Sequence, residues 1–339
     1  YIKTGDKCVL EFNGIFHFAI YDKRIGQIKL FSDKFGLQPL YYSTLTDGII
    51  FAAEIKAILK EKNVRRIPDY QSFADFLHYG QILGQKTLFQ DIKLLAPGSI
   101  LTFNLSKKDL SLEQYFQLEY LFVKEGKCNP GVSKEEVASY LTKSIKARSA
   151  NPNTLGLSLS GGLDSRAILA GLEKDAEGMH TYTLGISGCA DQKLAERMAR
   201  VGKTNHKFVE LDQKYLQNFK GMADSMIRLS DGMYHPHEST EMLALEYFKS
   251  AEFKILLRGH GGEIAKASLA YPVMVTPQVT ACSRGRDVLE HIFTITNLVT
   301  RDNNPGELFT SSFYKKTKDA ARQSLDDSCG EASQTLAPA

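Results

Sequence analysis

The feature that most constrains the fold is a glycine-containing loop, Ser160-Gly-Gly-Leu-Asp-Ser165, between an apolar strand-like run and a helical pattern. Two adjacent glycines let the backbone turn sharply and approach a ligand without a Cβ in the way. The following helix begins with unbonded N–H groups and a partial positive charge, which suit an anion. The loop therefore predicts a phosphate site, with Asp164 reaching the phosphate through a bridging Mg²⁺. The alternative is a surface turn in which Asp164 caps the helix. The Ser160–Ser165 loop is not a Walker loop, because no Gly-Lys-Ser/Thr follows.

Strand-like and helical patterns alternate through the second half of the chain. We expect strands at 154–159, 180–186, 207–211 and 254–257, and helices at 166–173, 191–201 and over a long stretch after 211. This alternation predicts βαβ units and a parallel sheet. Ligands bind beyond the carboxyl ends of such strands. Both the Ser160 loop and a second glycine-rich segment, Arg258-Gly-His-Gly-Gly-Glu263, directly follow predicted strands.

The first part of the chain has a different pattern, with short aromatic and β-branched runs separated by turns. Strands are expected at 12–21, 27–31, 48–51 and 100–103, with a helix at 71–78. A polar Gly/Pro-containing stretch then precedes Ser133 and Glu136, which form a capping-box pattern for a helix through Ala147. The last residues are small and polar. We therefore predict four segments: a domain at 1–120, a linker at 121–133, a domain at 134–320 and a disordered tail at 321–339.

Composition narrows the class of protein and its partners. A length of 339 residues favours two domains. The net charge of +3 argues against a dedicated nucleic-acid surface, and no apolar run reaches the ~20 residues of a membrane helix. The five cysteines are odd in number and form no Cys-x-x-Cys pair, which fits a reducing cytoplasm better than a disulfide framework or a zinc site. We predict a cytoplasmic protein with small-molecule partners, and leave open whether it forms a homodimer.

Several segments resemble known families. The loop is similar to that of the ATP pyrophosphatase superfamily, and nearly the whole chain resembles asparagine synthetase. Four early segments resemble the class II glutamine amidotransferase domain: Phe12–Asp22, Asp33–Tyr42, Phe51–Ala57 and Ala96–Gly98. Thr183–Ile186 with Asp191 and Leu194 resembles the elements beside the adenine pocket. The resemblance implies an α/β chain in which part of an N-terminal-nucleophile-type αββα sandwich precedes a doubly wound parallel-sheet ATP pyrophosphatase domain.

The resemblance also implies a two-step reaction. Aspartate attacks the α-phosphate of ATP to give an aspartyl-adenylate and pyrophosphate, and ammonia, free or derived from glutamine, then displaces AMP. The pyrophosphate and Mg²⁺ would be held by Ser160, Gly161, Gly162, Asp164 and Ser165. Leu159 and Leu184 would meet the nucleotide, and Gly259 and Gly261 would begin the second loop. Glu263 would be the acidic partner of Asp164, with both acting in catalysis and metal binding.

The sequence departs from the family pattern in three places. The N-terminal cysteine nucleophile is missing, since the chain starts at Tyr1 and Cys8 is internal. We therefore expect a fragment, the alternative being a protein that does not hydrolyse glutamine. The second loop lacks the usual Gly-x-Gly-x-Asp-Glu, and Ser32 and Arg166 replace an arginine and a small residue. These departures leave two alternatives open: a β-lactam synthetase-like or peptide-cyclising ligase acting on another carboxylate, and a non-catalytic nucleotide-binding remnant.

Histidines near the second half of the site allow more than one interpretation. His235 and His237, with Asp231 and Glu238 nearby, are either a metal site or ordinary polar loop residues. Asp231 and His237 are alternatively expected to line the acceptor pocket, since the family places substrate contacts in this stretch. His260 either touches phosphate or is a solvated loop residue.

Overall fold

The computed structural model describes residues 1–118, 133–149, 151, 154–260, 285–299 and 303–336. The chain divides into two compact units. Unit 1 consists of Tyr1–Gly126, Ser230–Tyr234 and Ala281–Ala339, and unit 2 of Lys127–Leu229 and His235–Thr280. The division at Gly126 and Lys127 falls inside the stretch predicted as a linker. Residues 285–299 and 303–320, which the prediction assigned to the second domain, are grouped with unit 1.

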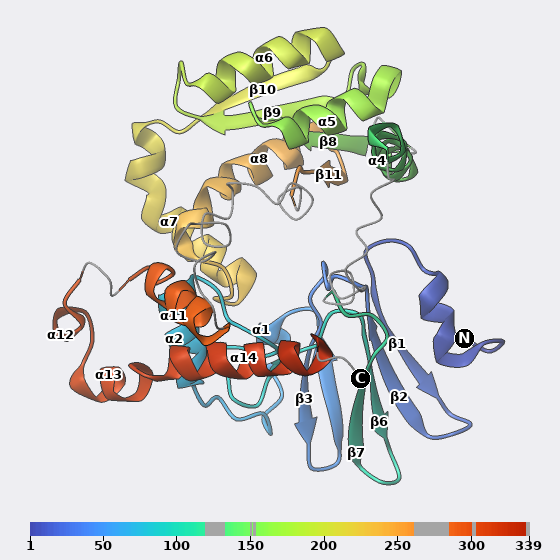
Figure 1. Ribbon diagram of the computed structural model, residues 1–339, viewed down its shortest axis with the longest axis vertical. Coiled ribbons are helices and arrows are strands. Elements are labelled where there is room, and N and C mark those ends of the chain that lie inside the picture. The colour runs from blue at the N-terminus through green and yellow to red at the C-terminus, as the bar shows by residue number, and fades with distance from the viewer. Residues whose placement is uncertain (119–132, 150, 152–153, 261–284, 300–302, 337–339) are drawn as a thin grey trace. The chain divides into compact units, whose positions relative to one another are not determined.

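Unit 1 is built on two antiparallel sheets (Figure 1). The first has the order β1-β2-β6-β7, formed by β1 (His17–Asp22), β2 (Gln27–Ser32), β6 (Ser99–Asn104) and β7 (Asp109–Gln114). The second has the order β4-β3-β5, formed by β4 (Gly48–Ala52), β3 (Tyr41–Leu45) and β5 (Lys93–Leu94). The helical segments of this unit are η1 (Gly5–Glu11), α1 (Ile55–Ile58), α2 (Tyr70–Tyr79), α11 (Gly285–Ile295), α12 (Pro305–Leu308), α13 (Ser311–Thr317) and α14 (Ala320–Leu336).

The two sheets pack in layers because successive side chains of a strand point to opposite faces. On β2, Leu30 packs in one buried cluster with Tyr42 of the second sheet. The next residue, Phe31, faces the other side and packs with Val9 of η1. On β3, Tyr41 likewise faces away from the first sheet, toward the buried residues of α1. The order helix, sheet, sheet, helix confirms the predicted αββα arrangement.

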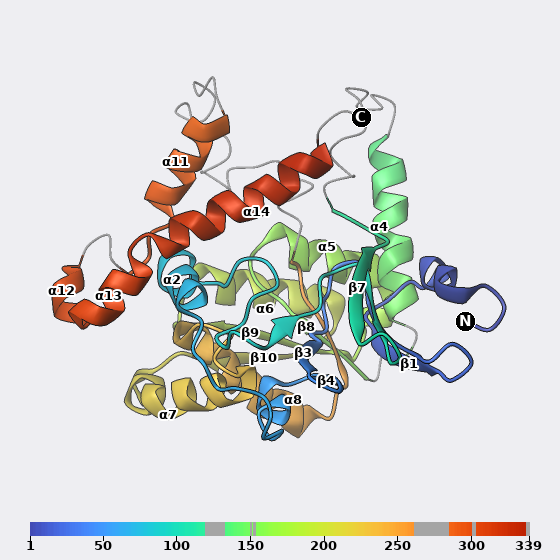
Figure 2. The same cartoon turned by 90° about the horizontal axis from the view of Figure 1, so that it is seen from below.

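The C-terminal segment differs from the sequence-based prediction. Residues from 321 were expected to be disordered, whereas α14 runs through Leu336 and lies against α2 (Figures 1 and 2). Ala321 and Leu325 are buried, and the Ser324 hydroxyl donates to Asp75 Oδ2 at 2.8 Å. Ser324 and Asp75 lie 249 residues apart in the chain. The helix is therefore stabilised by distant contacts, which local composition cannot reveal.

Unit 2 is built on a parallel sheet of order β10-β9-β8-β11, which confirms the predicted doubly wound domain. Its strands are β8 (Leu155–Ser158), β9 (His180–Gly185), β10 (Asn205–Glu210) and β11 (Ile255–Leu257). Its helical segments are α4 (Lys134–Arg148), α5 (Leu163–Leu172), η3 (Glu173–Ala176), α6 (Ala190–Gly202), α7 (Gln213–Ser230), η4 (Pro236–Thr240) and α8 (Glu241–Ala251). The predicted capping box opens α4: Ser133 Oγ accepts from the Glu136 N–H, and the Glu136 carboxylate accepts from the Ser133 N–H.

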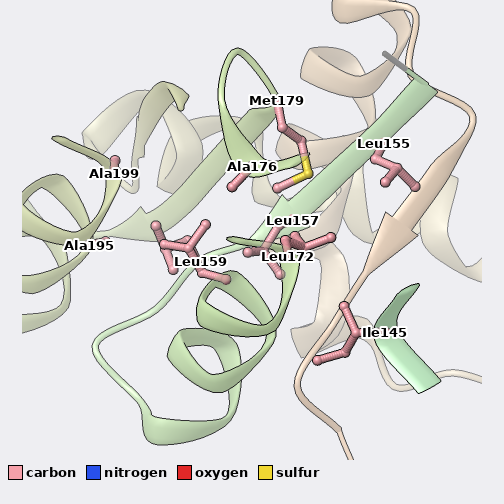
Figure 3. Close-up of a cluster of buried hydrophobic side chains, with 10 residues drawn as sticks. Ile145, Leu155, Leu157, Leu159, Leu172, Ala176, Met179, Ala195 and Ala199 are labelled. Atoms are coloured by element: carbon pink, nitrogen blue, oxygen red, sulfur yellow. The ribbon is translucent and has the colours of Figure 1, made fainter. Parts of the chain in front are cut away.

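The core of unit 2 fixes the position of β8. Every second residue from Leu155 to Leu159 is a leucine, so the three leucines point to the same face of the sheet. There they are fully buried against residues of α5 and α6 (Figure 3). Gly156 faces the opposite side, where a Cβ would lie only 2.5 Å from the ring of Phe253. Because both faces of β8 are tightly packed, the loop that follows it begins from a rigid strand.

Candidate functional site

The strand order of unit 2 places two loops at a topological switch point. The chain passes from β8 to β9 and β10 on one side, and β11 then pairs with β8 on the other side. The loops that leave β8 and β11 therefore diverge at the carboxyl edge of the sheet. Ligands of doubly wound sheets bind in the crevice that such a divergence creates.

A pocket of about 220 Å³ lies at this edge. It is lined by Ser158, Ser160, Gly162, Asp164, Ser165, Arg258, Gly259 and His260. The structure thus brings together the two loops that the sequence singled out, although they lie far apart in the chain. The volume is below the ~300–1,000 Å³ of ordinary small-molecule pockets. The part of the site formed by residues up to 260 therefore suits part of a ligand, such as its phosphate groups.

Hydrogen bonds within the first loop set its shape. The Ser160 N–H donates to Ser165 Oγ at 3.1 Å, and the Gly162 N–H donates to Ser160 Oγ at 3.1 Å. The Gly161 N–H donates to Asp191 Oδ1 at 3.0 Å, which ties the loop to the first turn of α6. A Cβ on Gly161 would lie 2.5 Å from that carboxylate oxygen, so a larger residue would displace the Asp191 side chain that holds the loop.

The loop ends at the start of α5, which offers donors to an anion. Gly162 occupies the N-cap position, and no side chain in the described part of the chain caps this helix. The first turn of an α-helix has N–H groups without intrahelical partners, and its end carries a partial positive charge. Gly162, Asp164 and Ser165, which form this turn, line the pocket. An anion in the pocket would take the place of the missing cap.

The second loop is held against the first by a glycine. A Cβ on Gly259 would lie 2.6 Å from Asp164 Cβ and 2.9 Å from the Ser165 nitrogen. Backbone cannot yield at such distances without moving the start of α5. The contact between the two loops therefore depends on the absence of a side chain at 259, and it gives the pocket a fixed width.

The charged groups of the pocket are of both signs. Asp164 contributes a carboxylate, and Arg258 a guanidinium that donates to Glu241 Oε1 at 2.8 Å. Asp164 and the serine hydroxyls are hard oxygen donors, which Mg²⁺ prefers, and Mg²⁺ is commonly held by one or two carboxylates plus substrate phosphates. The residues present fit that arrangement, although the described residues include no group of three or more potential metal ligands.

Leu159 and Leu184, the predicted nucleotide contacts, both lie at the carboxyl edge of the sheet but differ in how far they are buried. Leu159 is fully buried in the core, its N–H donates to the Tyr182 carbonyl, and its carbonyl accepts from the Thr183 hydroxyl. The Leu159 side chain and N–H are therefore both engaged, and a nucleotide could meet only the second lone pair of the Leu159 carbonyl oxygen. Leu184 is half-buried near the end of β9. Gly261 and Glu263 lie outside the described residues.

Arg258 is a residue of the pocket that sequence reasoning gave no role. In the sequence it is only the first residue of the second glycine-rich segment. The signal that could have found it is its position directly after the last strand of a parallel sheet, where strand ends meet. His260, for which phosphate contact was one of two interpretations, is exposed and lines the pocket.

The histidine segment and Asp231 do not join this pocket. The Nδ1 atoms of His235 and His237 lie 2.6 Å apart, and His237 Nε2 lies 3.7 Å from the Glu238 carboxylate. Asp231 belongs to unit 1, where its carboxylate accepts from the Ile55 N–H at 2.7 Å and caps the start of α1. Its geometry is that of a helix cap, and its expected place in an acceptor pocket stays a prediction.

Comparison with known proteins agrees with this architecture. Residues 1–116 match the family described as glutamine amidotransferase domain, and residues 136–272 match the family described as asparagine synthase. The two matches define a class of proteins that join a glutamine amidotransferase domain to an asparagine synthase domain on one chain. The chain belongs to the asparagine synthetase family.

Relatives with assigned names are similar at low identity. The chain is 26% identical to a putative asparagine synthetase [glutamine-hydrolyzing] 2 of Methanocaldococcus jannaschii, over 78% of this chain and 51% of the relative. It is 28% identical to asparagine synthetase [glutamine-hydrolyzing] 2 of Bacillus subtilis, over 54% of this chain and 26% of the relative. With the asparagine synthetase of Rattus norvegicus the identity is 23%, over 78% and 47%. The chain therefore spans about half the length of these relatives or less. None of the helices in the described ranges is long and apolar enough to cross a membrane.

Proposed function

We propose that unit 2 binds ATP and activates a carboxylate, that of aspartate, as an acyl-adenylate, and that the amide nitrogen comes from glutamine or ammonia. The observation that carries the proposal is the pocket at the switch point, where the uncapped start of α5 and the Gly259 loop meet. The names of the relatives support the same reaction.

The chemistry follows from how this pocket treats charge. A carboxylate oxygen attacks the α-phosphorus, a new P–O bond forms, and the bond to the β-phosphate oxygen breaks to release pyrophosphate. Negative charge grows on the leaving group, and the first-turn N–H groups of α5 are fixed donors for it. Because the loop is held by Ser160, Ser165 and Asp191, these donors need no rearrangement during the step.

Asp164 would hold Mg²⁺ against the phosphate oxygens. Bound there, the ion would neutralise part of the charge on the phosphate chain. The carboxylate itself would otherwise repel a polyanion in the same pocket. The presence of Asp164 beside the donors of α5 is therefore better explained by a metal–nucleotide complex than by a free anion.

Unit 1 supports an amidotransferase role through its family match and its layered sheets. Glutamine hydrolysis there would supply ammonia, whose nitrogen attacks the acyl carbonyl of the adenylate and displaces AMP. Amide formation with glutamine and with ammonium salts, measured side by side, separates the two nitrogen sources.

The decisive test is exchange of labelled pyrophosphate into ATP, with and without candidate carboxylates. The proposal predicts exchange that requires aspartate. Exchange with a larger carboxylate only would replace aspartate with another acceptor, as in a β-lactam synthetase-like or peptide-cyclising ligase. No exchange with any carboxylate, in a chain that still binds ATP, would favour a non-catalytic nucleotide-binding remnant.

A further inference from the structure

Arg258 lines the pocket and directly follows β11, the strand on one side of the switch point. Leu257, the last residue of β11, pairs with Leu157 of β8, so the residues that follow this pair in the two segments stand side by side. These residues are Arg258 and Ser158, and both line the pocket. The Arg258 side chain keeps 37% of its surface exposed, so its charged head remains accessible to a ligand.

The guanidinium is held from outside the pocket by Glu241. Arg258 Nη2 donates to Glu241 Oε1 at 2.8 Å, and the Glu241 side chain is 25% exposed. Glu241 is the first residue of α8, where the positive end of the helix favours a carboxylate. The pair is therefore anchored on a helix start and not on a loop.

The backbone of Arg258 is fixed as well. Its neighbour Gly259 is pressed against Asp164 and the Ser165 nitrogen, as the 2.6 and 2.9 Å distances of a Cβ there show. Both charges of the pair act on the buried Tyr182, whose pKa is raised by burial and, to a smaller extent, by Glu241, while Ser158 and Arg258 lower it. Backbone and guanidinium are thus both held, which leaves little rotational freedom for a ligand to remove.

We infer that Arg258 binds phosphate oxygens of the nucleotide, and that Glu241 is a positioning residue acting through Arg258. The inference rests on the proposed function and adds a cationic contact to it. A guanidinium carries five N–H donors in a planar fork that matches phosphate. The bond to Glu241 uses one of them. The start of α5 forms another part of the same pocket, so a phosphate would meet donors from two elements.

The test measures binding of ATP and of inorganic pyrophosphate, each with Mg²⁺, to the full chain by titration calorimetry. Arg258→Met should weaken both by about 10- to 100-fold, because the loss of a charge-assisted hydrogen bond removes about 1.4–2.8 kcal/mol at 1.4 kcal/mol per factor of ten. Arg258→Lys, which keeps the charge but loses the fork, should fall between Arg258→Met and the unchanged chain. Lys146→Met is the matched control, since it removes a surface cation paired with Glu173 at 2.9 Å in the same unit and should leave binding unchanged.

A double-mutant cycle tests the role of Glu241. Glu241→Gln should weaken pyrophosphate binding by about 3- to 10-fold when Arg258 is present and have no effect in an Arg258→Met background. An equal effect in both backgrounds would overturn the positioning role.

The outcomes separate the two proposals. If the unchanged chain binds neither ATP nor pyrophosphate, the proposed function and this inference both fail. If it binds them and folded Arg258→Met binds equally well, only the phosphate contact of Arg258 is overturned. Should Arg258→Met fail to fold, by circular dichroism, Arg258→Lys decides: weakened binding supports the inference, and unchanged binding contradicts it.

Discussion

Two aspartates that follow strands have different roles in the two units. Asp33 comes directly after β2, is 1% exposed, and accepts backbone N–H groups of Phe35 at 3.0 Å, Leu37 at 3.3 Å and Phe16 at 3.4 Å. Asp164 follows β8 through the loop and lines the pocket. The same residue type thus builds a turn in unit 1 and faces a ligand site in unit 2. Family resemblance alone does not tell these two roles apart.

Other carboxylates of unit 1 are, like Asp33, hydrogen-bonded to groups of the same unit. Asp231 caps α1, and Asp75 accepts from the Leu83 N–H at 3.1 Å and from the Ser324 hydroxyl at 2.8 Å. Asp22 binds Arg24 through both carboxylate oxygens. Substitutions in unit 1 should therefore change stability, whereas substitutions at the pocket of unit 2 should change nucleotide chemistry.

The largest expected effect is that of Asp164→Asn on ATP–pyrophosphate exchange. The change removes the proposed metal ligand, and we expect a loss of at least about 100-fold. Stability should change by no more than about 0.5 kcal/mol, as for other substitutions outside a core. Asp175→Asn, on the exposed segment η3 of the same unit, is the control. Exchange that survives in Asp164→Asn would place Asp164 with the structural aspartates.

Gly259→Ala should follow, with a loss of exchange of about 10- to 100-fold. The added methyl would meet Asp164 and the Ser165 nitrogen, so one loop must shift, and displacements near 1 Å are known to reduce rates by about 100-fold. Gly221→Ala in α7 adds a methyl where no atom lies within 4 Å. It should keep full exchange and stabilise its helix by about 0.5–1 kcal/mol. Equal activity of the two variants would show that the contact between the loops is not needed.

Asp33→Asn should have the reverse profile. Loss of an acceptor for buried N–H groups should destabilise unit 1 by about 1–3 kcal/mol, measured by urea unfolding followed by circular dichroism. ATP binding by unit 2 should stay unchanged, because the contacts of Asp33 lie within unit 1. Asp47→Asn, at a side chain that is 83% exposed, should alter neither property. A loss of ATP binding in Asp33→Asn would show that Asp33 does not act on the stability of unit 1 alone.

The smallest effect concerns pH. Hydrogen bonds from Arg24 lower the pKa of Asp22 from its usual 3.8 to about 2. Because the folded state favours the ionised form, the stability from this pair is complete above about pH 4 and is lost as the pH falls toward 2. Asp22→Asn should therefore reduce the slope of urea midpoint against pH in this window, and 1 M salt should reduce it in the unchanged chain. An unaltered slope in Asp22→Asn would assign the acid sensitivity to other carboxylates.

The elements of unit 2 were predictable because local and global signals agree there. The alternation of patterns placed a strand at 180–186 and a helix at 191–201, close to the observed His180–Gly185 and Ala190–Gly202. The Ser160 loop was also placed correctly between strand and helix. Each of these features has a signature within a few residues, as glycine pairs, apolar runs and caps do.

What the sequence could not reveal depends on distant contacts. Helix α14 was missed because its small polar residues are stabilised by packing on α2. The cap that Asp231 forms on α1 could not be predicted because its partner Ile55 lies 176 residues away in the chain. The sequence places Arg258 after a predicted strand, but its position beside Ser158 depends on the pairing of β11 with β8. In each case a non-local contact decides the role of the residue.

Attack of a carboxylate on the α-phosphate of ATP in the unit 2 pocket leaves an isotopic signature in the products. The most direct measurement uses aspartate labelled with oxygen-18 in its side-chain carboxylate, with ATP and a nitrogen donor, and mass analysis of the products. The account predicts one labelled oxygen in AMP and none in pyrophosphate, because the attacking oxygen stays on phosphorus when nitrogen displaces AMP. Label in inorganic phosphate together with ADP, or turnover without label in AMP, would contradict it.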